Sequence, residues 1–203
     1  TPAAFIAEVK RANPEFVIYL DGKPGSAHHV TMWADSLRAT GRRFIVVCRN
    51  ADDHKVIGDK GIPCTLVVGR KALSALGSLG VPAIFYVNNA RGNSLLLRFN
   101  DIVHVQLLHG ESDKPSSYNP FTSAYDIVCV AGNLGRDRYF MNNVYIEPSK
   151  FRVVSRPQCE GLGVARSPAT GIRTVLYAPT WRDATYGLPM ASIHHGREIA
   201  EAV

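Results

Sequence analysis

The sequence has no apolar run that approaches the roughly 20 residues of a membrane-spanning helix. Residues 1–8 also lack the basic-then-apolar order of a secretory signal. Of the 203 residues, 46% are hydrophobic and 20% are charged, which is typical of a globular protein and not of a disordered or fibrous one. The length suits one large domain, or one domain and part of a second.

Motifs for metal, disulfide and nucleotide chemistry are also missing. None of the four cysteines has a C-x-x-C partner, and Cys48, Cys64 and Cys129 lie in or beside strand-like runs, which favours reduced thiols. Neither glycine-rich motif of ATP and dinucleotide sites occurs. The pairs His28-His29 and His194-His195 do not predict a metal site, because adjacent rings on a helix diverge by roughly 100°.

Acidic residues are few in one segment. The chain carries a net charge of +6, and residues 136–182 contain eight Lys or Arg against three acids. This excess favours a phosphorylated substrate, an anionic membrane surface or nucleic acid as partner, and a solvated basic face explains it equally well. We expect no nucleic-acid binding, since no recognised module occurs and few aromatics interleave the basic residues.

Short runs rich in Val and Ile alternate with helical segments through the first three quarters of the chain. Such runs, bounded by Gly, Pro, Asn and Asp, are typical of strands buried on both faces. The alternation predicts an α/β fold, a Rossmann-like doubly wound parallel sheet. The expected strands are 16–20, 43–48, 64–68, 83–87, the run into His109, 126–130 and 151–155; the expected helices are 5–12, 29–39, 52–57, 70–79 and 134–141.

The last quarter of the chain has a different character. A polar, Gly-rich stretch follows residue 160, and we interpret 161–172 as a linker after a domain of residues 1–160. A strand over 173–179 and a helix from about residue 193 come next. One strand and one helix cannot make a domain, so we expect 173–203 to be the start of a second, truncated domain.

His109 is the first candidate for catalysis. It ends a strand-like run and precedes Gly110, and doubly wound folds place their chemistry at the carboxyl ends of parallel strands. A histidine there is suited to act as a general base, and the glycine would let a substrate approach the backbone. A histidine that only hydrogen-bonds at a strand end is an equal alternative.

Other polar loops are predicted at the same edge. Glu111, Asp113 and Lys114 follow His109 and are candidates to orient its imidazole or to contact a phosphate. The segment 88–94, which contains Asn89, and the Gly132-Asn133 turn are expected to line the same cleft. The turn 21–29 could receive an anion at a helix start, although a plain β-to-α turn is favoured.

One family resembles this sequence from about residue 80 onward. Gln106-x-x-His109-Gly110-x-x-x-Lys114 resembles the Q-x-W-H-G-x-x-x-K signature of the CDP-glycerol glycerophosphotransferases, the teichoic acid polymerases of the bacterial envelope. The strand 125–130 follows, and 175–182, which ends in Arg182, is similar to the family's I-L-Y-A-P-T-[WF]-R. Leu108 replaces the signature's Trp, and 155–160 keeps only Pro157 of a G-x-P-R-x-D pattern.

The resemblance implies a GT-B fold, with two Rossmann-like domains and no metal or other cofactor. His109 would be the acceptor-side general base, and Gly110, Asp113, Lys114, Asn89 and Arg182 would bind substrate. The implied partners are CDP-glycerol or a related nucleotide donor and an anionic envelope polymer as acceptor. The full-length protein would be cytoplasmic and peripheral to the inner face of the cell membrane, and this fragment alone would be inactive.

Two other functions stay open at this point. The departures at 155–160 permit a GT-B glycosyltransferase that uses a nucleotide-sugar. A non-catalytic Rossmann-like module that binds an anionic polymer or membrane would also explain the basic segment.

Overall fold

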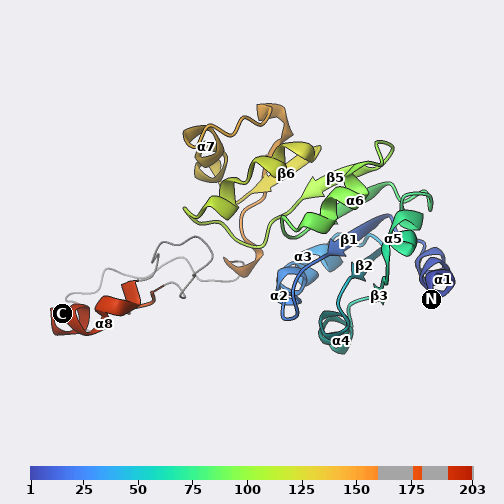
Figure 1. The fold of residues 1–203 in the computed structure, drawn as a ribbon, viewed down its shortest axis with the longest axis horizontal. Coiled ribbons are helices and arrows are strands. Elements are labelled where there is room, and N and C mark those ends of the chain that lie inside the picture. The colour runs from blue at the N-terminus through green and yellow to red at the C-terminus, as the bar shows by residue number, and fades with distance from the viewer. Residues whose placement is uncertain (160–175, 180–191, 203) are drawn as a thin grey trace. The chain divides into compact units, whose positions relative to one another are not determined.

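The computed structural model describes residues 1–159, 176–179 and 192–202 (Figure 1). Seven strands lie within the first of these ranges, with helices between them. The strands are β1 Phe16–Leu20, β2 Phe44–Cys48, β3 Cys64–Leu66, β4 Ala83–Tyr86, β5 Val103–Gln106, β6 Ile127–Val130 and β7 Phe151–Val153. The α-helices are α1 Pro2–Ala12, α2 His28–Thr31, α3 Ala34–Ala39, α4 Ala51–Asp59, α5 Arg70–Leu76, α6 Ser94–Leu97, α7 Asn133–Met141 and α8 Gly196–Glu201. The 3-10 helices are η1 Arg91–Asn93, η2 Pro115–Tyr118, η3 Pro120–Ala124, η4 Pro148–Lys150, η5 Pro157–Cys159 and η6 Ser192–His195.

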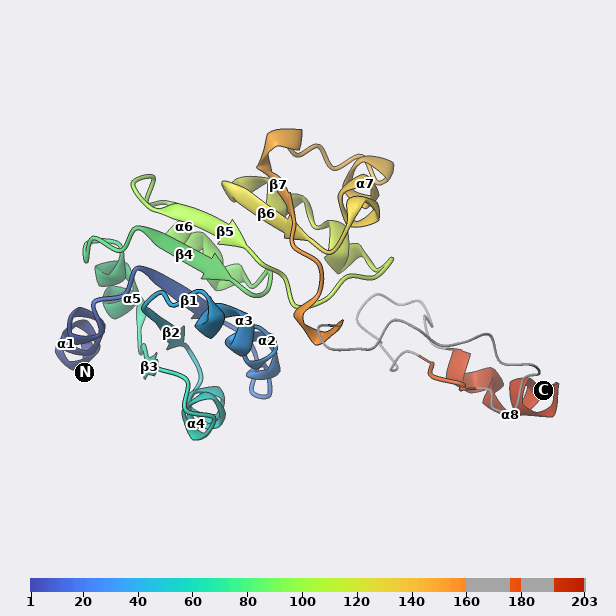
Figure 2. The ribbon, with the colours of Figure 1, turned by 180° about the vertical axis from the view of Figure 1, so that it is seen from behind.

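All seven strands form one parallel sheet in the order β3-β2-β1-β4-β5-β6-β7. β2 and β3 lie on one side of β1 and the last four strands lie on the other, so the order reverses between β1 and β4. The view from behind shows β6 and β7 at the end of the sheet away from β3 (Figure 2). The predicted doubly wound α/β fold is therefore confirmed.

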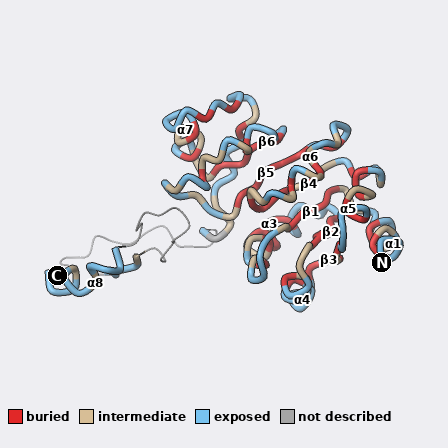
Figure 3. The backbone as a smooth tube through the Cα atoms, in the orientation of Figure 1, coloured by how far each residue is buried: buried red, intermediate tan, exposed pale blue. Residues whose placement is uncertain are grey.

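Most residues of the central strands are buried (Figure 3). Their side chains alternate between two cores, one on each face of the sheet. Val17 and Tyr19 of β1 pack into the core that α1, α5, α6 and α7 cover. Phe16, Ile18 and Leu20 of the same strand pack into the core that α2, α3 and α4 cover. Five consecutive buried residues in β1 explain why the sequence shows an unbroken apolar run there.

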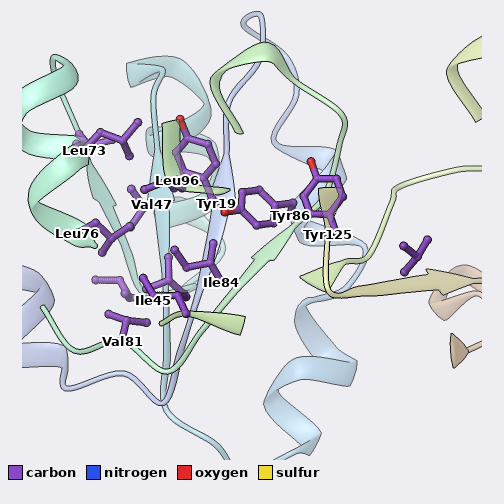
Figure 4. Close-up of a cluster of buried hydrophobic side chains, with 14 of the residues drawn as sticks. Tyr19, Ile45, Val47, Leu73, Leu76, Val81, Ile84, Tyr86, Leu96 and Tyr125 are labelled. Carbon is purple, nitrogen blue, oxygen red and sulfur yellow. The ribbon is translucent and has the colours of Figure 1, made fainter. Parts of the chain in front are cut away.

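Three of the buried tyrosines in the first core, Tyr19, Tyr86 and Tyr125, lie next to one another (Figure 4). Tyr86 contacts Tyr19 edge-on, with ring centroids 6.0 Å apart, and Tyr125 at 5.0 Å. All three rings are fully buried, and the Tyr125 hydroxyl accepts a hydrogen bond from Asn93 Nδ2 at 2.8 Å. Aromatic pairs of this kind join β1, β4 and the start of β6 beneath the edge where the loops gather.

One predicted helix is interrupted. Residues 29–39 form two short helices, α2 and α3, and not one. The break lies at Met32 and Trp33, and the Trp33 ring is buried with its Nε1–H donating to the Leu108 carbonyl at 3.0 Å. The free energy gained from this hydrogen bond to the loop after β5 outweighs the free energy lost where the helix is interrupted.

The Cα positions divide the chain into two compact units, Thr1–Glu160 and Gly161–Val203. In the second unit, residues 176–179 are not part of a strand, and the rest of the strand expected over 173–179 lies outside the described residues. Helix α8 confirms the helix expected near residue 193, and Arg197 pairs with Glu201 along it. In the described parts of the chain, no helix is long and apolar enough to cross a lipid bilayer.

Candidate functional site

Three loops meet at the carboxyl edge of the sheet, where the strand order reverses. They follow β1, β4 and β5, and side-chain hydrogen bonds join them. Asn88 Nδ2 donates to the Asp21 carbonyl at 2.8 Å, and Gln106 Nε2 donates to the Asn88 carbonyl at 3.1 Å. In doubly wound folds ligands bind at this point of the sheet, so reactive groups in these loops are candidates for a functional site.

His109 lies in the loop after β5 with one ring nitrogen occupied. Its Nδ1 is 2.9 Å from the Val87 carbonyl oxygen. A carbonyl can only accept, so Nδ1 must carry the proton, and in the neutral ring Nε2 then has a lone pair. No other described residue hydrogen-bonds this nitrogen. The geometry is that of a proton acceptor with a fixed tautomer.

Burial keeps this ring neutral. The pKa of His109 is lowered below its ordinary value of 6.5, mainly by desolvation, with smaller contributions from His28 and Arg156. The Val87 hydrogen bond acts against this shift and raises the pKa. At neutral pH His109 is therefore unprotonated at Nε2, as a general base must be.

His104 shows the contrasting, structural case. It is buried in β5, its Nδ1 accepts from the Tyr86 hydroxyl at 2.8 Å, and its Nε2 donates to the Phe99 carbonyl at 3.0 Å. Both nitrogens of His104 are occupied, so it has no lone pair for a substrate. Only His109 of these two has a nitrogen left for chemistry.

The backbone before His109 is held in an uncommon conformation. Leu108 has φ 57, in the left-handed region that few residues other than glycine adopt. Its N–H donates to Gln106 Oε1 at 3.1 Å and its carbonyl accepts from Trp33 Nε1, so both backbone groups are fixed. These hydrogen bonds offset the strain of the left-handed conformation at Leu108. That conformation directs His109 toward the loop after β4.

The other predicted site residues lie in different surroundings. Gly110 is exposed, and a Cβ added there would meet nothing within 4 Å, so there is open space beside the backbone after His109. Asn89 is engaged inside the protein: its Oδ1 accepts from Gln106 at 2.8 Å and its Nδ2 donates to Thr122 at 3.1 Å. Lys114 precedes helix η2, and its N–H donates to Ser112 Oγ. Arg182 lies outside the described residues.

A carboxylate and two guanidinium groups lie next to this loop. Glu111 Oε1 accepts from the Ala131 N–H at 2.7 Å and is 3.3 Å from Arg156 Nη2, and Oε2 is 3.6 Å from Arg138 Nη1. The three side chains are at most 18% exposed. Asp113, 95% exposed, pairs with Arg138 Nε at 3.0 Å. Two cations and two anions form this network, and both guanidinium groups share Glu111, next to the neutral base.

The close packing of this network requires a glycine in α7. A Cβ at Gly135 would come within 2.5 Å of Glu111 Oε2. The carboxylate therefore occupies the space where α7 would otherwise carry a side chain. This contact fixes the loop after β5 against α7.

Several residues that build the site were not among those predicted from the sequence. Trp33 and Gln106 fix Leu108, His29 stacks on His109 at 3.6 Å between ring centroids, and Arg156 follows Ser155, another non-glycine residue with positive φ. Gln106 had a signal as part of the motif, and His29 lies in the turn 21–29 that could receive an anion, but no signal linked His29 to His109. The described residues contain no group of three His, Cys, Asp or Glu side chains that could hold a metal ion.

Comparisons with known proteins show likeness at the level of structure. No family profile matches the sequence, and neither does any curated protein. Anabaena HepE, solved in complex with UDP and glucose, has a TM-score of 0.50 and 12% identity, over 70% of this chain and 44% of that one. At this identity the likeness shows the fold alone, a Rossmann-like α/β fold of the kind found in GT-B glycosyltransferases.

Two further solved structures are similar to this chain. A glycosyltransferase from Rickettsia africae has a TM-score of 0.49 and 15% identity, with 70% of this chain and 42% of that one covered. The wall teichoic acid polymerase TagF has a TM-score of 0.46 and 12% identity, with 79% of this chain and 47% of that one covered. This chain spans less than half the length of each of these three proteins.

Proposed function

We propose that this chain is the acceptor-side part of a GT-B-type transferase that transfers a polyol phosphate from a CDP-activated donor to an anionic envelope polymer. In this proposal residues 1–160 hold the acceptor, 161–172 are a linker, and 173–203 begin the donor-binding domain. The observation that carries it is the hydrogen bond from His109 Nδ1 to Val87, which leaves Nε2 as a proton acceptor at the reversal of strand order.

His109 is the general base of the proposed reaction. Its Nε2 takes the proton of an acceptor hydroxyl while that oxygen attacks the β-phosphorus of CDP-glycerol. The new O–P bond forms as the bond from phosphorus to the CMP oxygen breaks, and CMP leaves with the electron pair. A neutral imidazole is required because only that form has a free lone pair.

Arg156 and Arg138 supply positive charge for this chemistry. The charge of Arg156 contributes to the lowered pKa of His109, which supports a role for this guanidinium beside the base. Charge that develops on a transferring phosphoryl group is stabilised by fixed cations. Gly110, Asp113, Lys114 and Asn89 complete the proposed acceptor side, and Arg182 belongs to the donor side.

A nucleotide-sugar glycosyltransferase is the second candidate. The fold likeness to HepE, solved with UDP and glucose, and the departures from the polymerase signature at Leu108 and 155–160 support it. The same base would then deprotonate a hydroxyl that attacks a sugar carbon. We place either enzyme at the cytoplasmic side of the membrane, where activated nucleotide donors and a membrane-bound acceptor meet.

Donor choice separates these candidates. The full-length protein is incubated with an acceptor and, in parallel, with CDP-glycerol or UDP-glucose, and the released nucleotide is measured. Acceptor-dependent release of CMP supports the polyol-phosphate transferase. Release of UDP alone would contradict that proposal and support the glycosyltransferase. No release from either donor, together with binding of an anionic polymer, would contradict both and favour the non-catalytic module.

A further inference from the structure

A second histidine ring lies flat against the proposed base. His29, in α2, stacks on His109 with ring centroids 3.6 Å apart and an interplanar angle of 15°. His28 meets the two rings edge-on, at 4.3 Å from His29 and 6.4 Å from His109. The function proposed above gives His29 no role, and its sequence context, a His-His pair in the turn 21–29, predicts no contact with His109.

The two stacked rings are anchored to the same short segment after β4. His109 donates to the Val87 carbonyl, and Asn88 Nδ2 lies 3.4 Å from His29 Nδ1. Asn88 Nδ2 also contacts the Asp21 carbonyl, so this amide nitrogen is a donor and His29 Nδ1 is the acceptor. The proton of neutral His29 is therefore on Nε2, and both tautomers are set by neighbouring residues.

Stacking in this register covers one face of the His109 ring and leaves its edge open. A face-to-face neighbour limits rotation about the Cβ–Cγ bond, which would otherwise swing Nε2 away from a substrate. It also excludes water from that face, and loss of water disfavours the charged imidazolium.

The surrounding charges act in the same direction. Burial, together with His109 and His28, lowers the pKa of His29 to about 3, so this ring stays neutral wherever the enzyme would work. The groups that face His109 are His28 and His29 from α2, Arg156 after β7 and the Val87 carbonyl. Three of these are cationic or can become so, and none is an anion that would favour a protonated base.

We propose that His29 is a positioning residue, which holds the His109 ring in place and keeps it neutral by stacking on it. The reaction that this serves rests on the function proposed above, whereas the stacking itself does not. His29 touches neither the acceptor hydroxyl nor the phosphate in this proposal; it acts through His109.

Two substitutions separate stacking from a merely structural role. His29→Phe keeps a flat ring and removes its titratable nitrogens, and His29→Ala removes the ring. We expect His29→Ala to raise the pKa of His109, read from its Cε1 proton in NMR titrations of the full-length protein. The acid-side inflection in the pH profile of kcat/KM moves to higher pH together with this pKa. The value of kcat falls by on the order of tenfold to a hundredfold, while KM changes little.

His29→Phe is expected to keep kcat within a few-fold of wild type and to keep the pKa of His109 low. His54→Ala, on α4, is the matched control and should change neither quantity. An unchanged pKa of His109 in folded His29→Ala would overturn the proposal, and so would His29→Phe that behaves like His29→Ala. If the full-length protein transfers nothing but the titration shifts as expected, the proposed function fails and the positioning role stands.

Discussion

At the scale of single residues, the account rests on which nitrogen of His109 carries the proton. The 2.9 Å contact with the Val87 carbonyl requires a proton on Nδ1, and burial lowers the pKa of the ring. His104, five residues earlier in the chain, has both nitrogens bonded and marks the structural alternative. The sequence could not distinguish these two histidines, since their hydrogen bonds depend on partners elsewhere in the chain.

We expect neutral His109 to be seen directly. In the full-length protein labelled with ¹⁵N-histidine, the His109 ring should show the Nδ1–H tautomer at neutral pH and titrate below 6.5. The physical reason is the carbonyl acceptor at Nδ1 together with desolvation of the cation. A ring that is protonated on both nitrogens at neutral pH, or that carries its proton on Nε2, would contradict the assignment.

Gln106 is expected to be the most sensitive uncharged residue of the site. Its buried amide bonds the Asn88 carbonyl, Asn89 and the Leu108 N–H. In Gln106→Leu the Asn89 Oδ1 and the Leu108 N–H lose this partner, whereas the Asn88 carbonyl keeps its bond from Asn93 Nδ2. We expect the free energy of unfolding to fall by on the order of 2–4 kcal/mol, since each buried orphan costs about 1–3 kcal/mol. Denaturant unfolding measures this.

Ser94→Ala is the control for that experiment, because the Ser94 hydroxyl bonds the Arg91 carbonyl at an exposed position. It should change stability by less than about 0.5 kcal/mol. Equal stabilities of the two variants would show that Gln106 does not hold the loop.

At the scale of elements, the strands could be predicted and the contacts between loops could not. An apolar run such as residues 16–20 of β1 is a local signal, because both faces of the strand are buried. The break between α2 and α3 depends on a bond from Trp33 to Leu108, 75 residues away, which no local pattern contains. The stacking of His29 on His109 was missed for the same reason.

Glu111 joins three parts of the chain, as Gln106 joins neighbouring loops. Its carboxylate connects the loop after β5 to α7 and to the segment after β7. Glu111→Gln removes the anion shared by Arg138 and Arg156. Breaking a fully buried pair costs roughly 3–5 kcal/mol, and because these groups retain some solvent contact we expect a loss of about 2 kcal/mol in the free energy of unfolding.

Asp113→Asn is the matched control for Glu111→Gln. Asp113 also pairs with Arg138 but is 95% exposed, and such a pair contributes about 0–1 kcal/mol. Thermal unfolding of the two variants compares them. A larger loss in Asp113→Asn than in Glu111→Gln would contradict the role given to the buried network.

At the scale of the whole molecule, the buried histidines make stability depend on pH. His29 has a pKa of about 3 in the folded protein and 6.5 when unfolded, so below 6.5 the unfolded chain takes up a proton that the folded one does not. Stability is therefore complete above pH 6.5 and decreases as the pH falls toward about 3. We expect urea midpoints of the wild type to fall between pH ~7 and pH ~5, and to fall less in His29→Phe. An identical decrease in both would contradict the burial of a neutral His29.

The parallel sheet explains why such a site can be rigid. Its loops leave strands that are buried on both faces, and the three that meet at the strand-order reversal are joined by side-chain hydrogen bonds. The basic segment noted in the sequence has a partly internal use, since Arg138 and Arg156 pair with Glu111. Composition alone could not separate this use from a solvated face or a binding surface.

The central claim, that His109 is the base of a nucleotide-dependent transferase, is tested most directly by acceptor-dependent release of nucleotide from the donor. The full-length wild type is compared with His109→Gln and with His54→Gln as control. We predict that His109→Gln lowers the rate on the order of 10²–10⁴-fold and that His54→Gln leaves it unchanged. A folded His109→Gln protein that releases nucleotide at the wild-type rate would contradict the account.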